Sequence, residues 1–110
     1  AIYPYAAPSV ARAIAGREDN LLNFPLLRDR GGEPWARWFT EINRPDLAAR
    51  VPETRRLRAL LAIEAVIAEQ GVLLSSADNV KHDEAAGRLV RCFNHGFQQG
   101  SYNMLIGEGV

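Results

Sequence analysis

The sequence predicts an α/β fold in which helices separate the strands of a mainly parallel, layered sheet. Short apolar runs, such as residues 72–74 and 88–93, alternate with stretches that have helical periodicity. Parallel strands require crossover connections of this kind, because their ends lie at opposite edges of the sheet. The 110 residues have the length of one ordinary domain.

The first half of the chain contains two predicted helices on either side of a strand. Residues 7–15 predict a short helix with proline in its first turn, and the apolar run 24–29 predicts a buried strand. Residues 33–42 predict the second helix, because four apolar side chains recur at helical spacing. These side chains are Trp35, Trp38, Phe39 and Ile42. We interpret them as core; the alternative is an aromatic box for a ligand.

The second half contains the longest predicted helix. A polar connection at 43–47 precedes the ambiguous stretch 49–57, for which we favour a strand. Residues 58–70 then predict a long helix that ends at Gly71. The remaining segments are expected to form, in order, a strand, a loop with a short helix, a strand, a turn region and a final strand, over residues 72–74, 75–87, 88–93, 94–101 and 102–106.

Composition excludes several classes of protein. Lysine plus arginine and aspartate plus glutamate each number 13, so the basic excess of a nucleic-acid-binding domain is missing. No apolar run approaches the roughly 20 residues of a membrane-spanning helix. The chain opens on Ala1 without the features of a secretion signal, as an internal piece of a larger cytoplasmic protein would.

Residues for catalysis or metal binding are scarce. His82 and His95 lie far apart in the sequence, and no spacing of metal ligands occurs. Cys92 is the only cysteine. It is interpreted as a small buried apolar group, the alternative being a thiol nucleophile with His95 as its base. We therefore expect no enzyme activity, no metal and no cofactor.

An arginine cluster is the one polar constellation of interest. Arg55, Arg56 and Arg58 lie where the predicted strand leads into the long helix. In a strand, Arg56 would share a side with Thr54, and Arg55 would point the other way. With the free backbone N–H groups of the helix start, these cations could hold a carboxylate or another anion. The alternative is a solvated basic edge paired with Glu53.

Several motifs, taken in order, resemble one protein family. Residues 3–10 and 19–29 resemble a hinge strand followed by a "DL…PLL" strand, and 34–39, PWARWF, resembles a "W..WF" helix. Residues 60–74 and then 85–93, AAGRLVRCF, continue the pattern. Their order and spacing across nearly the whole chain resemble the effector-sensing domain of LysR-type bacterial transcriptional regulators. Glu69, Ser75 and Cys92 depart from the residues usual in that family.

The resemblance implies that residues 1–110 are a single lobe, the second, of a two-lobed effector-binding domain of type II periplasmic-binding-protein kind. Hinge strands would lie near 1–6 and 102–106, and the DNA-binding domain and first lobe would be absent from this sequence. The resemblance places effector contacts in two sets, Ala6, Ala7, Pro8 and Ser9, and Arg56, Leu57, Arg58 and Ala59. Because the arginine cluster falls on the second set, an anionic effector and a solvated edge remain equal alternatives.

The resemblance also implies a subunit interface on the long helix, within a homodimer or homotetramer. Its residues would be Leu60, Glu64, Ile67 and Ala68. The alternative for the apolar members is packing on their own sheet. The implied function is sensing of a small-molecule effector, whose binding in the cleft alters the geometry of the DNA-bound oligomer. DNA contact would come only through the absent N-terminal domain, without a membrane. The alternative function is a lobe of a transporter's solute-binding protein.

Overall fold

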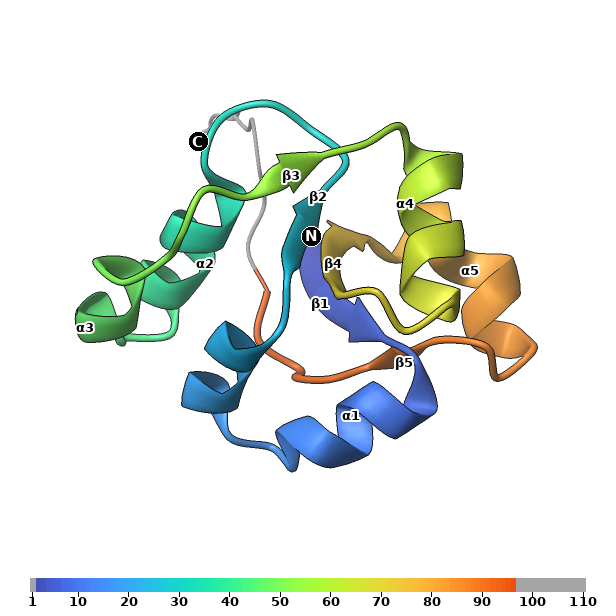
Figure 1. Ribbon diagram of the computed structural model, residues 1–110, viewed down its shortest axis with the longest axis horizontal. Helices are drawn as coiled ribbons and strands as arrows, with labels where there is room; N and C mark the ends of the chain where they lie inside the picture. Colours follow the sequence, from blue (N-terminus) through green and yellow to red (C-terminus); the bar gives the residue numbers. More distant parts are fainter. Residues whose placement is uncertain (1, 97–110) are drawn as a thin grey trace, which may run out of the picture.

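Five strands form one sheet with helices on both faces (Figure 1). The computed structural model describes residues 2–96, so the predicted strand and hinge at 102–106 lie outside the described residues. The elements in chain order are β1 (Ile2–Ala6), α1 (Pro8–Ile14), the 3-10 helix η1 (Glu18–Asn23), β2 (Leu26–Arg28), α2 (Pro34–Glu41), α3 (Pro45–Ala48), β3 (Arg55–Arg56), α4 (Ala59–Ile67), β4 (Val72–Ser76), α5 (Ala77–Ala85) and β5 (Val90–Arg91).

The strand order is β3-β2-β4-β1-β5, with β4 at the centre. β2 pairs parallel with both β3 and β4, whereas β1 pairs antiparallel with β4 and β5. Among the described strands, β1 therefore runs alone against the direction of the others. This arrangement confirms the predicted α/β class and its mainly parallel sheet.

Alternate residues of β4 point into two separate cores. Val72 and Leu74 pack into the larger core, which α1, η1, α2 and α3 cover. Leu73 packs into the smaller core under α4 and α5. Because side chains of a strand alternate between its faces, one central strand supplies both cores, and the fold has three layers.

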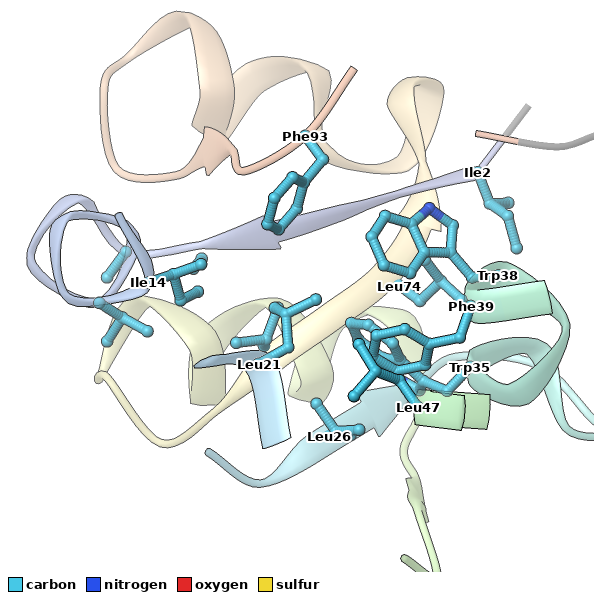
Figure 2. Close-up of a cluster of buried hydrophobic side chains, with 14 residues drawn as sticks. Ile2, Ile14, Leu21, Leu26, Trp35, Trp38, Phe39, Leu47, Leu74 and Phe93 are labelled. Carbon is cyan, nitrogen blue, oxygen red and sulfur yellow. The ribbon is translucent and has the colours of Figure 1, made fainter. Parts of the chain in front are cut away.

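The tryptophan helix is part of the larger core, as predicted (Figure 2). Trp35, Trp38 and Phe39 are completely buried, and the two indole rings meet edge to face at 6.0 Å between centroids. Each indole N–H donates to a backbone carbonyl, Trp35 to Leu27 at 2.8 Å and Trp38 to His95 at 2.9 Å. With rings and donors satisfied inside the protein, no aromatic ligand box remains.

Several predicted boundaries are wrong. The strand expected over 49–57 contracts to β3, because the chain first forms α3 and its turns, and Pro52 lacks the N–H that a ladder needs. The helix expected over 58–70 ends at Ile67, and Glu69 then takes a left-handed φ of 64°. Ser75 and Ser76 extend β4 instead of starting a loop. Only Val90 and Arg91 of the expected strand 88–93 pair with β1.

Over residues 2–96, no helix has the length and apolar character needed to cross a membrane.

Gly71 provides a test of this packing. Its φ is +155°, and a Cβ added there would lie 2.6 Å from the carbonyl oxygen of Pro25. We expect Gly71→Ala to lower the free energy of unfolding by more than about 2 kcal/mol, because backbone must move to accommodate the methyl group. Gly87 has a φ of +80° and no neighbour within 4 Å of the same added atom, so Gly87→Ala should cost only about 1 kcal/mol. Urea unfolding of both variants measures the difference. Equal losses would contradict the close approach to Pro25.

Candidate functional site

The carboxyl ends of β2, β3 and β4 meet at one edge of the sheet, because these strands run parallel. Open α/β sheets bind ligands beyond such ends. A hollow of about 510 Å³ lies at this edge. Its lining residues are Asp29, Arg56, Leu57, Arg58 and Ala59. We call it the carboxyl-edge hollow. It brings together all four residues of the second predicted contact set.

Asp29, which the sequence analysis missed, carries a buried carboxylate, and its side chain is only 2% exposed. Ser75 donates its hydroxyl to Asp29 Oδ2 at 2.5 Å, and Asn79 donates to the same oxygen at 3.2 Å. Arg30 Nε donates to Oδ1 at 2.8 Å. These bonds compensate the charge of the carboxylate and tie the loop after β2 to β4 and α5. The position of Asp29 at the carboxyl end of the predicted buried strand 24–29 is the signal that could have identified it.

The three arginines of the cluster divide between two sides of β3. Arg56 and Arg58 line the carboxyl-edge hollow, whereas Arg55 lines a separate pocket together with Leu57 and Ala65. All three side chains are exposed. Within residues 2–96, no ion pair joins any of them to Glu53 or to another acidic side chain. The paired basic edge that we considered is therefore not formed in this part of the chain.

The first predicted contact set lies at the opposite edge of the sheet. β1 is antiparallel to β4, with Ile2 opposite Ser76, so its other end carries Ala6 away from the hollow. Four residues of strand span about 13 Å. Ala6 and Ala7 are buried, Pro8 is partly buried, and the hydroxyl of Ser9 is buried and has no hydrogen-bond partner among residues 2–96. The structure therefore separates the two predicted sets, which one small molecule could not contact together.

The outer face of α4 is apolar and exposed. Leu60 is 78% and Leu61 54% exposed, whereas Ala62, Ile63 and Val66 face the sheet and are buried. Glu64 and Ala68 of the predicted interface are exposed as well, whereas Ile67 is partly buried and packs against the smaller core, as the alternative proposed. Leu60 therefore does not pack on its own sheet, and Leu61 joins the same surface without having been predicted.

Cys92 lies in a setting that suits packing. Burial raises the pKa of its thiol to about 12, so the reactive thiolate is scarce near neutral pH. Its sulfur lies 4.0 Å from the carbonyl oxygen of Val90, and the residue packs against the larger core. The described part of the chain also contains no group of three or more His, Cys, Asp and Glu residues placed to hold a metal ion.

Comparisons with known proteins agree with this geometry. No family model matches the sequence, and no curated protein matches it significantly. Solved structures do match. The effector domain of the transcriptional regulator AmpR of Pseudomonas aeruginosa superposes with a TM-score of 0.74 and 27% identity, over 86% of this chain and 45% of that chain. The chain resembles LysR-family effector-binding domains.

Two further structures belong to the same group. The AmpR effector-binding domain from Citrobacter freundii has a TM-score of 0.70 and 25% identity, over 84% of this chain and 46% of that chain. The C-terminal domains of a LysR family protein from Agrobacterium tumefaciens have a TM-score of 0.61 and 24% identity, with the same coverage of 84% and 46%. These matches confirm the predicted resemblance and its periplasmic-binding-protein-like fold. The chain spans slightly less than half the length of each of these LysR-family domains.

The reactivity of Cys92 tests its burial. With a pKa raised to about 12, the native thiol should react with a disulfide reagent at pH 8 at least about a hundredfold more slowly than the thiol of the urea-unfolded chain. The native state also favours the protonated thiol. The stability that this contributes is complete below the ordinary pKa of 9.0 and is lost as the pH rises toward about 12. Cys92→Ala removes that part of the pH dependence. Equal labelling rates in the two states would contradict a buried thiol.

Proposed function

We propose that this chain is the second lobe of the effector-binding domain of a LysR-type transcriptional regulator. In this proposal, the carboxyl-edge hollow forms one wall of a cleft for a small-molecule effector. The observation that carries the proposal is a hollow lined by two arginines that have no ion-pair partner among residues 2–96. The hollow lies beyond the carboxyl ends of the parallel strands, where open α/β sheets bind ligands, and the sheet matches slightly less than half of such a domain.

The course of the backbone supports the assignment of residues 1–110 as one lobe with a hinge. Ile2, at the start of β1, pairs with Ser76 at the end of β4. A Cβ added to Gly96 would lie 2.6 Å from the carbonyl oxygen of Ile2, so the chain passes this edge again at residue 96. In the proposal, these neighbouring segments, at the same end of the sheet as the hollow, would continue into the hinge between the two lobes.

An anionic effector fits the electrostatics of the hollow. Arg56 and Arg58 have no ion-pair partner among residues 2–96, while Asp29 is already neutralised by its own donors. α4 begins at Ala59 with no side-chain cap, so its first N–H groups add a partial positive field on the same side. A carboxylate or phosphate would meet two cations and no uncompensated negative charge.

The proposed mechanism is binding, without a catalysed reaction. An effector between the two lobes stabilises a closed arrangement, which changes how subunits sit on DNA. The free energy available is the difference in its affinity for the two arrangements. DNA would be contacted by a separate N-terminal domain of the regulator, which acts in the cytoplasm. The solved structures reported above favour this function over the solute-binding protein of a transporter.

The exposed face of α4 is proposed as a subunit interface of a homodimer or homotetramer. Leu60 and Leu61 are large apolar side chains that the lobe leaves largely in water. Covering them with a partner subunit would stabilise association by about 25 cal/mol for each Å² removed from water, before the cost of association. Glu64 and Ala68 lie on the same side and would form the polar and small parts of the contact.

Arg56 and Arg58 provide the test of the anion site. Inorganic phosphate at ten times its dissociation constant should stabilise the wild-type chain by about 1.4 kcal/mol, which raises the melting temperature by several degrees. Arg56→Ala or Arg58→Ala should remove most of this shift. Arg55→Ala, which deletes the same charge on the other side of β3, should retain it.

Melting curves in phosphate and in chloride of equal ionic strength separate binding from general screening. Equal shifts in all three arginine variants would show that net charge, and not the carboxyl-edge hollow, binds the anion. No shift in the wild type would contradict the anionic effector.

The α4 interface is tested by Leu60→Glu in the full-length regulator. A charge at this exposed position should weaken self-association at least tenfold, because it must be desolvated in the interface. Lys81→Glu on the exposed surface of α5 is the matched control and should leave association unchanged. Sedimentation equilibrium measures both. An unchanged dimer or tetramer in Leu60→Glu would place the interface elsewhere.

A further inference from the structure

We propose that Arg28 is a positioning residue for the anion site: it fixes the two backbone segments that hold Arg56 in place. This inference rests on the proposed function, because it concerns the same hollow. Arg28 does not line the hollow itself.

Arg28 links the segments on both sides of the carboxyl-edge hollow. Its Nε donates to Thr54 Oγ1 at 2.9 Å, just before β3. Its Nη1 donates to the carbonyl of Arg30 at 2.7 Å, in the loop after β2. Its own carbonyl accepts the N–H of Leu57 at 3.0 Å. One residue therefore joins the loop after β2 to the segment that carries both arginines of the site.

The hydrogen bond from Arg28 to the carbonyl of Arg30 holds the backbone next to Gly31, which lies beside Arg56. Gly31 follows Arg30 directly, and a Cβ added to it would lie 4.0 Å from Arg56 Nη1. The guanidinium of Arg56 therefore lies beside the backbone that Arg28 holds. Asp29 fixes the same loop from the opposite side, through Ser75 on β4. Because both sets of bonds hold the loop, its backbone keeps a fixed position beside the guanidinium of Arg56.

The chemistry of this link requires a guanidinium. Its planar fork donates in two directions at once, whereas a lysine ammonium is a single point charge on a flexible stem. Thr54 is 5% exposed, so its hydroxyl has little access to water when Arg28 no longer donates to it. Arg28→Lys keeps the positive charge near the hollow but cannot donate to Thr54 and Arg30 at once. The variant therefore separates the effect of the hydrogen-bond geometry from the effect of the charge.

The experiment measures the dissociation constant of inorganic phosphate for the 110-residue chain and its variants, at fixed ionic strength, by NMR titration. We expect Arg28→Lys to weaken binding about tenfold, the effect of a lost hydrogen bond from a charged group. Thr54→Val, which loses the hydroxyl but keeps the shape, should weaken binding about threefold. Thr54→Ser keeps the hydroxyl and should remain within about twofold of the wild type.

A double-mutant cycle distinguishes positioning from direct attraction. If Arg28 acts through Arg56, then Arg28→Lys should weaken binding less than about twofold in an Arg56→Ala background. The Nε–Hε resonance of Arg56 supplies a readout without ligand. It should shift in Arg28→Lys and in Thr54→Val, and stay in place in Thr54→Ser.

The outcomes separate this inference from the proposed function. If the wild type binds phosphate but Arg28→Lys binds equally well, or its effect is fully additive with Arg56→Ala, the positioning role is overturned and the anion site stands. If the wild type does not bind phosphate, the anion site is wrong and the positioning role falls with it. If Arg28→Lys fails to fold, the comparison of Thr54→Val with Thr54→Ser tests the inference instead. Equal dissociation constants of phosphate for these two variants would overturn it.

Discussion

The fold of residues 2–96 depends on the placement of β4 between β1 and β2. Val72, Leu73 and Leu74 are fully buried, and their alternation feeds the two cores on opposite faces of the sheet. A slip of one residue would exchange the faces of every side chain on the strand. The same register sets where the strand ends, and so places Ser75 beside Asp29. Packing in the core thus fixes the polar bonds at the edge.

The charged groups at the carboxyl edge of the sheet differ in how many hydrogen-bond and ion-pair partners the described residues give them. Asp29 has three donors and is buried, so it is a structural anchor for the loop after β2. Arg56 and Arg58 lie exposed, without acidic partners in the described chain. In our proposal, a compensated anion beside two cations that have no acidic partner among residues 2–96 would attract a negative ligand. The function that we propose follows from this imbalance, which the neutral total charge of the sequence conceals.

The sequence predicted what local periodicity determines, and missed what depends on pairing. The prediction of α2 was correct because Trp35, Trp38 and Phe39 recur at helical spacing. Asp29 was missed because its partner Ser75 lies 46 residues away and meets it only through parallel register. Ala6 to Ser9 and the arginine segment were expected, from the family resemblance, to be two sets of effector contacts, yet β1 is antiparallel to β4 and places Ala6 at the opposite end of the sheet. Strand direction is a tertiary property, which a pattern of alternating elements does not reveal.

We propose that the carboxyl edge of the sheet, and not the edge at the start of α1, is the wall that binds the ligand. The most direct measurement is a map of backbone amide chemical shifts during titration of the isotope-labelled chain with inorganic phosphate. We expect shifts confined to Asp29 and its loop and to Arg56 through Ala59, with the amide shifts of Ala7 and Ser9 unchanged. Shifts centred on the start of α1, or spread evenly over the surface, would contradict it.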